Sequence, residues 1–298
     1  MQRYSQLKLF KASRHISWKL FLASFCVFVI GGCNTNEARS ETVTLGATIP
    51  NVNLLVVTCE SGDIEIIQDP SAVIMQVKAD IRCVAETSEA AAERARQSNL
   101  STSYRQEDGQ VTLKVVFPPR ISNISNDFSH IVIRAAKLDG ISAQTSNGKL
   151  SLEAFRGTAN LQNSNGAISV KGHSGSIKMK SSNGAVEAIE VVGPVTAETS
   201  NGSITVLLNA AAQGSIDLST SNAGVSLVLP EMWQGSVKAS TSNGQISFDG
   251  GSKASDIKVN DDRGSMTFGD PTKSTATLKT SNGNVTVQMV LGKVILSH

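Results

Sequence analysis

The sequence predicts an all-β protein: a β-solenoid of about eight coils of 18–21 residues, preceded by a β-rich capping region that contains one helix. A four-residue signature, most often Thr-Ser-Asn-Gly, recurs through the second half of the chain. Between successive signatures lie short runs in which apolar and polar residues alternate, as in strands with one buried face. Aromatic residues make up only 4% of the sequence, which favours a thin, repetitive core over a globular one.

Residues 1–32 are typical of a bacterial lipoprotein signal peptide. Five basic residues and no acidic ones accompany an apolar run over residues 20–30. This run is shorter than the roughly 20 residues that a membrane-spanning helix needs. It leads into Ile30-Gly31-Gly32-Cys33, which resembles the bacterial lipobox. We therefore expect cleavage before Cys33 and a diacylglycerol on Cys33, with an ordinary signal peptide and a chance cysteine as the alternative. Asn34, rather than Asp, favours the outer membrane of a Gram-negative envelope.

Removal of the leader changes the charge of the protein. The whole chain has 27 basic and 25 acidic residues. Five basic residues belong to the leader, so 22 basic residues remain against 25 acidic ones, a net charge of −3. No basic footprint for nucleic acid remains, and we exclude nucleic acid as a partner.

The region between the leader and the repeats predicts a tether and a cap. Residues 33–44 are small and polar and are expected to be flexible. Residues 45–140 are expected to cap the solenoid, because the end coil of such an array exposes unpaired strand edges. An Ala-rich segment predicts a helix over 88–97, with Thr87 or Ser88 as the N-cap. Alternating segments predict strands at 54–59, 75–83, 111–117 and 131–134.

Two cysteines, Cys59 and Cys83, remain beside Cys33, because Cys26 leaves with the leader. A single pair in an oxidising compartment usually forms a disulfide. A bridge across a loop of about 24 residues would stabilise the fold by about 3 kcal/mol. We expect a Cys59–Cys83 disulfide, with two unrelated buried thiols as the alternative.

Residues 141–298 carry the repeat. Equivalent positions of successive signatures are 18 to 21 residues apart. Each unit contains two alternating runs separated by a second turn, commonly a glycine, so one unit is strand, turn, strand, corner. One unit ends instead in Asp261-Asp262-Arg263-Gly264. The Asn-Gly corners are Asn147-Gly148, Asn165-Gly166, Asn183-Gly184, Asn201-Gly202, Asn243-Gly244 and Asn282-Gly283.

Asn-Gly between alternating runs is also typical of tight hairpins, which would give an antiparallel meander. The near-constant unit length favours the solenoid, in which each strand pairs with its equivalent one coil on, about 4.8 Å away. In that arrangement Ile204 lies between Val186 and Val225. We expect Asn and Gly at the corner because both tolerate positive φ, and we expect stacked Asn side chains to form an amide ladder.

The Thr-Ser-Asn-Gly repeats, the opening segment Glu60-Ser61-Gly62-Asp63-Ile64-Glu65-Ile66 and the intervening helix resemble the bacterial putative-adhesin family. The resemblance extends from about residue 50 to the C-terminus. It implies a solenoid fold and a location in the cell envelope, and it carries no catalytic residues. The Asp261–Gly264 corner and the insertion at Pro118–Asn123 depart from the family pattern.

No catalytic or metal-binding constellation is evident in the sequence. His130, His173 and His298 have no partner at ligand spacing, and we expect all three to be exposed. No Cys/His metal set and no phosphate-binding glycine loop occurs. The acidic residues are scattered apart from Asp261 and Asp262. We interpret this pair as a turn that bonds to its own backbone, with a Ca²⁺ or sugar contact as the alternative. We expect no cofactor, no metal and no enzymatic activity.

One surface pattern is regular. The residue between the two apolar positions of each unit's first strand is expected to point outward, in a row of Ser151, Ser169, Glu187, Thr205, Ser226, Ser247, Thr267 and Thr286. Together these features predict a membrane-tethered envelope lipoprotein whose solenoid is a surface scaffold or binding module for an envelope protein or glycan. Because parallel β-helices also include polysaccharide lyases and hydrolases, a carbohydrate-active enzyme is the alternative.

Overall fold

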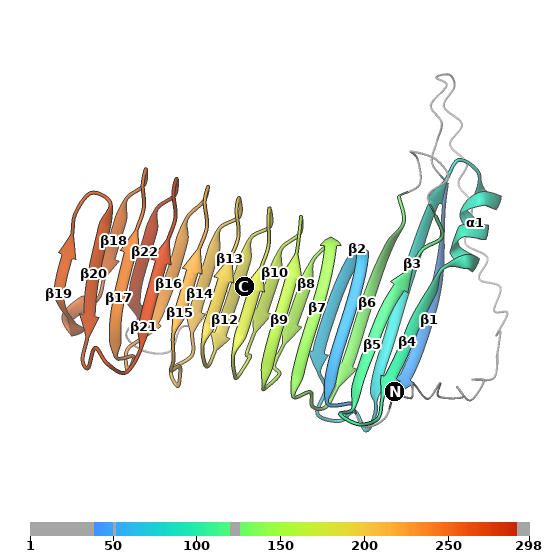
Figure 1. The fold of residues 1–298 in the computed structure, drawn as a ribbon, viewed down its shortest axis with the longest axis horizontal. Helices are drawn as coiled ribbons and strands as arrows, with labels where there is room; N and C mark the ends of the chain where they lie inside the picture. The colour runs from blue at the N-terminus through green and yellow to red at the C-terminus, as the bar shows by residue number, and fades with distance from the viewer. Residues whose placement is uncertain (1–38, 50–51, 120–125, 291–298) are drawn as a thin grey trace, which may run out of the picture.

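A computed structural model describes residues 39–49, 52–119 and 126–290, and these residues form a β-solenoid built from two facing sheets (Figure 1). This confirms the predicted fold class. The described residues contain one α-helix, α1 (Ser88–Gln97). No helix among them is long and apolar enough to cross a membrane. The expected leader over 1–32 lies outside the described residues.

The two sheets are named A and B, and the long strand β2 (Leu54–Gln68) contributes to both. In spatial order, sheet A contains β1 (Arg39–Ile49), β3 (Met75–Ala85), β6 (Phe128–Ala135), residues 62–68 of β2, β8 (Leu150–Glu153), β10 (Ile168–Lys171), β12 (Val186–Val191), β14 (Ile204–Leu208), β16 (Val225–Pro230), β22 (Val285–Val290) and β18 (Ile246–Asp249). Sheet B contains β4 (Asn99–Arg105), β5 (Gln110–Val116), residues 54–61 of β2, β7 (Gly140–Asn147), β9 (Thr158–Asn163), β11 (Ile177–Lys180), β13 (Val195–Glu198), β15 (Ile216–Ser219), β21 (Thr275–Lys279), β17 (Gly235–Ser240), β20 (Arg263–Phe268) and β19 (Ala254–Val259).

Equivalent strands of successive coils pair in parallel. Ile204 on β14 pairs with Val186 on β12 and with Val225 on β16, as predicted. The parallel region runs from β5 and β6 to β17 and β18, so nine coils stack, each with one strand in either sheet. An antiparallel meander is therefore excluded for the stacked coils.

The last repeat does not stack in sequence order. Its strands β21 and β22 insert between the coil of β15 and β16 and the coil of β17 and β18. The unit with the variant corner is not a coil, because β19 and β20 form an antiparallel hairpin that pairs with β17. Since this hairpin occupies one edge of β17, the final coil pairs with the other edge.

The opposite end is built from the residues before the repeat (Figure 1). Residues 39–44, expected in the tether, are instead the first half of β1, which pairs antiparallel with β3 from Arg39↔Ala85 to Ile49↔Met75. This pairing satisfies backbone groups along an edge of β3 that would otherwise be free. Strands β2, β5 and β6, within the region expected to cap, form two of the parallel coils. Helix α1 follows Thr87, whose hydroxyl accepts a hydrogen bond from the Ala90 amide at 3.1 Å.

A buried ion pair ties the helix to the strands at this end. Arg94 on α1 binds both carboxylate oxygens of Asp127, and the two side chains are only 4% and 6% exposed. Arg94 also donates to the carbonyls of Pro118 and Pro119, at 3.1 and 2.7 Å. The carboxylate further accepts from the Val84 amide at 3.3 Å. Helix, strand β3 and the segment before β6 thus share one polar cluster.

The core is a thin layer between the two sheets. In β10, for example, Ile168 and Val170 are buried while Ser169 and Lys171 point outward. The inward residues of all coils form one continuous cluster, which is mainly aliphatic. Two facing sheets at about 10 Å leave room for interdigitated Leu, Ile and Val but for few rings. This explains the low aromatic content.

Candidate functional site

Of the residues predicted from sequence to have a special role, Cys33 lies outside the described residues, and its lipidation stays a prediction. Cys59 and Cys83 are free, buried thiols, and the expected disulfide is not formed. Strand β6 lies between the strands that carry them, because it pairs with β2 on one side and with β3 on the other. Each sulfur contacts a serine hydroxyl instead, Cys59 at 3.0 Å from Ser129 and Cys83 at 3.4 Å from Ser98. Burial raises the pKa of both thiols.

The corner asparagines form the expected amide ladder along the rod. Each side-chain amide donates to the side-chain carbonyl of the asparagine one coil away, over 2.7–2.8 Å. The ladder follows the spatial order of the coils, so Asn282 lies between Asn222 and Asn243. Its members are Asn147, Asn165, Asn183, Asn201, Asn222, Asn282 and Asn243.

The first residue of the signature forms hydrogen bonds within and between corners that were not predicted from the sequence. The hydroxyl of Thr199 donates to the carbonyl of Gly184, one coil away, at 3.1 Å, and accepts from the amide of Gly202 in its own corner at 3.3 Å. Ser181 and Thr280 make the same two bonds with their neighbours. The recurrence of Ser or Thr at this fixed place in the repeat was the available signal in the sequence. At these three corners the spacing Ser/Thr-x-x-Gly thus lets one hydroxyl close the corner and join it to the neighbouring coil.

The reason for glycine at the corner differs from the one expected. None of the ladder asparagines has a positive φ, and among the glycines of the Asn-Gly corners only Gly148 does. Positive φ occurs instead at the second turn of most units, for example 99° at Gly157 and 134° at Gly175. At the corner the constraint is contact between coils, because a Cβ on Gly184 would lie 1.8 Å from the carbonyl oxygen of Gly166.

Gly184→Ala is therefore expected to destabilise the solenoid by about 2–3 kcal/mol, because two backbones must separate to admit the methyl group. Gly224→Ala is the matched control. The nearest atom to a Cβ there is the Asn284 carbonyl oxygen at 3.2 Å, and that glycine has no positive φ. Urea unfolding of the mature chain measures the free energy of unfolding of both variants. Equal losses in the two variants would contradict the close-contact explanation.

The outward row on sheet A is straight and mostly hydroxylated. Adjacent members pair across the strands at a spacing of about 4.8 Å. Thr267 is not a member, because it lies on β20 in sheet B. The row runs Ser151, Ser169, Glu187, Thr205, Ser226, Thr286 and Ser247. Such a row offers regularly spaced donors and acceptors to a long polar ligand.

The histidines are placed differently from one another. His173 was expected to be exposed but is buried, because its ring contacts the second turn of the preceding coil, with Nε2 3.2 Å from the Gly157 carbonyl. Burial lowers the pKa of His173 and favours its neutral form. His130 does have partners, since its ring nitrogens lie 3.9 Å from carboxylate oxygens of Asp63 and Glu65. More than 60 residues separate these partners in sequence, so spacing could not reveal them. His298 lies outside the described residues.

Within the part of the chain that the structure describes, the acidic side chains do not converge in a cleft. Asp63 and Glu65 are half-exposed on the outer face of sheet A. Among the described residues, no group of three or more His, Cys, Asp and Glu side chains is arranged to hold a metal ion. In the variant corner, the backbone N–H of Asn260 donates a hydrogen bond to the backbone carbonyl of Arg263 at 2.8 Å. The carboxylate of Asp262 lies 3.6 Å from the Arg263 guanidinium. This corner is a hydrogen-bonded turn.

No protein-family model matches the chain, and no curated protein does. Solved bacterial structures do resemble it. A putative cell adhesion protein from Clostridium sporogenes aligns with a TM-score of 0.35 at 10% identity, covering 85% of this chain and 100% of that one. A putative adhesin from Bacteroides fragilis gives 0.35 at 14% identity, with 83% and 97% covered. A putative lipid binding protein from Parabacteroides distasonis gives 0.34 at 15% identity, with 82% and 96% covered.

Proposed function

We propose that this chain is a lipoprotein of the bacterial cell envelope, tethered to the membrane through Cys33, whose solenoid is a surface scaffold or binding module without catalytic activity. The observation that carries the proposal is the register of the coils. Equivalent residues stack across nine parallel coils, so polar side chains form straight rows over a rod about 40 Å long. A regular, rigid polar face suits multivalent binding of an extended envelope protein or glycan.

The network between coils supports a rigid scaffold. Between most of the stacked coils, the backbone pairing is accompanied at the corner by a bond from the signature's first side chain and by an amide bond to the neighbouring coil, as at Thr199 and Asn201. The hydroxyl bonds are buried and the ladder amides are exposed, and together these mutually supporting hydrogen bonds favour one geometry. The rod therefore keeps the spacing of its surface groups when a ligand binds.

The alternative function, a carbohydrate-active enzyme, would in its hydrolase form need two carboxylates that flank the scissile bond. Asp63 and Glu65 point the same way from one strand, on an open face, and both lie beside His130. We therefore expect isolated envelope polysaccharides to be retained by the immobilised protein without new reducing ends or unsaturated products. Release of either product in proportion to protein would favour the enzyme.

The tether has a direct test. Cys33→Ser should abolish palmitate labelling in growing cells and move the protein from the membrane fraction to the soluble fraction, because the acyl chains provide the membrane affinity. Immunoblotting of both fractions and radiolabelled palmitate measure the two effects. Cys26→Ser is the matched control and should leave both unchanged. Palmitate labelling that persists in the Cys33 variant would contradict the assignment of Cys33 as the lipidated residue.

A further inference from the structure

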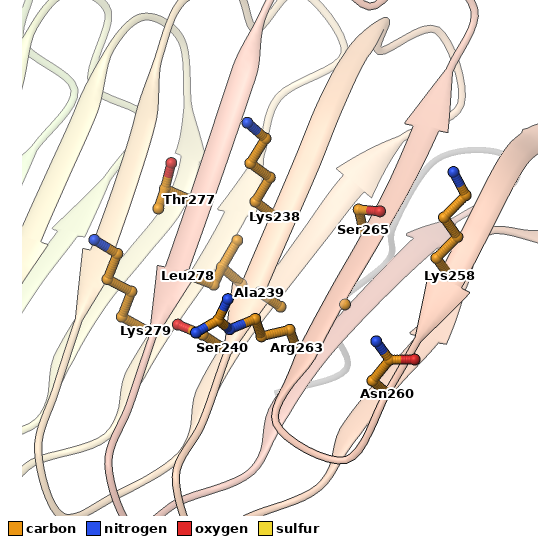
Figure 2. A pocket seen from close by; sticks show the side chains of 11 residues that line it. Lys238, Ala239, Ser240, Lys258, Asn260, Arg263, Ser265, Thr277, Leu278 and Lys279 are labelled. Atoms are coloured by element: carbon orange, nitrogen blue, oxygen red, sulfur yellow. The ribbon is translucent and has the colours of Figure 1, made fainter.

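The far end of the rod carries a pocket with a different chemistry from the rest of the surface. It lies on the outer face of sheet B, over strands β21, β17, β20 and β19, and has a volume of about 520 Å³ (Figure 2). Strand β1, the first described strand after the proposed anchor, is at the opposite end of the solenoid (Figure 1). The pocket is thus at the end away from the tether.

Four cationic side chains line this pocket, which we name the cationic pocket: Lys238, Lys258, Arg263 and Lys279. They come from four strands between residues 235 and 279: β17, β19, β20 and β21. The antiparallel hairpin β19–β20 and the inserted strand β21 bring them together on both sides of β17. The concentration of charge is therefore a product of the out-of-order stacking.

Across the paired strands of the pocket, cationic side chains alternate with side chains that carry a hydroxyl group. One row across the strands is Thr277, Lys238, Ser265 and Lys258. The parallel row beside it is Lys279, Ser240 and Arg263. Cations in the same row are thus two strands apart, about 10 Å, with a hydroxyl group between them.

Within the lining of the cationic pocket, the positive charge is not balanced by carboxylates, although Asp217 lies opposite Thr277 at the edge of the row. None of the residues that line the cationic pocket is acidic. Arg263 contacts Asp262 at 3.6 Å, but the two side chains are 80% and 60% exposed, and such exposed pairs are weak. No described carboxylate lies within ion-pair distance of Lys238, Lys258 or Lys279. Because the chain without its leader has a net charge of −3, this is a local feature and not a general basic surface.

We propose that the cationic pocket binds an acidic polysaccharide, with the four cations holding its carboxylate or sulfate groups and the intervening hydroxyls bonding to the sugar. The proposal deepens the binding-module function and rests on it. Ser240, Ser265 and Thr277 can each donate and accept, as sugar hydroxyls do. The repeated charges of a polysaccharide match cations that recur along a row, and several weak contacts add when they are held on one rigid surface.

Two other polyanions fit the pocket less well. Binding of single-stranded nucleic acid uses aromatic side chains for base stacking, and the cationic pocket has none. Stable binding to a membrane surface needs apolar anchors beside the charge. The apolar lining residues here, Ala239 and Leu278, are buried side chains of the core.

The test compares two double variants in the mature chain made soluble by Cys33→Ser. K238Q/K279Q removes two cations from the pocket. K178Q/K180Q is the matched control, because it removes the same charge from β11 on the same outer face, at equivalent positions of the repeat outside the pocket. Binding of each protein to polygalacturonate, heparin and neutral dextran is measured at low and at physiological ionic strength. Thermal unfolding of each variant checks that the fold is retained.

We expect the parent protein and K178Q/K180Q to bind at least one acidic polysaccharide similarly, K238Q/K279Q to bind it about tenfold more weakly, and none to bind dextran. Binding should weaken as salt rises. Equal losses in the two variants, undiminished binding by K238Q/K279Q, or no binding by the parent would each overturn the proposal. Preference of the parent for vesicles of anionic phospholipid over both polysaccharides would also overturn it. Palmitate labelling at Cys33 and retention of other envelope components are independent of these results, so the pocket can fail while the proposed function stands.

Discussion

Ile204→Asp is expected to lower the free energy of unfolding by about 3–5 kcal/mol, because it buries an unpaired carboxylate and removes an aliphatic side chain from the core. Ile204 is fully buried on β14, between Val186 on β12 and Val225 on β16. In a linear array, stability depends on the interfaces between neighbouring units. The damage should therefore spread to both neighbouring coils. Urea unfolding measures the energy, and amide hydrogen exchange measures the spread.

Amide hydrogen exchange tests the coupling between coils more specifically than the unfolding energy does. Protection should fall on the strands that contain Val186 and Val225, and not only near the substitution. Ser226→Asp is the control, since Ser226 follows Val225 on the neighbouring strand β16, points outward and has Thr205 and Thr286 opposite it. It should change stability by no more than about 0.5 kcal/mol. Loss of protection confined to residues 196–208 in the Ile204 variant would contradict coupling between coils.

Asp127→Ala is expected to cost about 3–5 kcal/mol, because it leaves the buried guanidinium of Arg94 without its carboxylate. Arg94 would keep only its bonds to the carbonyls of Pro118 and Pro119. Local opening should therefore concentrate on α1 and β3, which share this cluster. Thermal unfolding and exchange of the α1 amides report the effect.

A double variant separates the charge effect from general damage at this end. Arg94→Met combined with Asp127→Leu replaces the pair by apolar side chains of similar size, and this exchange is often neutral. We expect it to recover most of the stability lost in Asp127→Ala. A double variant as unstable as the single one would show that the ion pair is not the source of the loss.

The sequence alone determined the unit of this fold. Its period, the alternation within each unit and the Asn at each corner predict parallel coils, and Ile204 pairs with Val186 and Val225 as that pattern requires. Local patterns are sufficient here because every unit buries the same face against an almost identical neighbour. Helix α1 was predictable for the same local reason, a capping Thr87 before an Ala-rich segment.

Only the tertiary structure decided which units are neighbours. All the units have nearly the same register and shape, so the sequence does not distinguish stacking in chain order from the insertion of β21 and β22 beside β15 and β16. The hairpin β19–β20 decides between them by occupying one edge of β17. The same long-range placement assembles the cationic pocket, sets His130 between Asp63 and Glu65, and keeps Cys59 apart from Cys83. Each of these depends on which strands become neighbours in the folded protein, which periodicity does not encode.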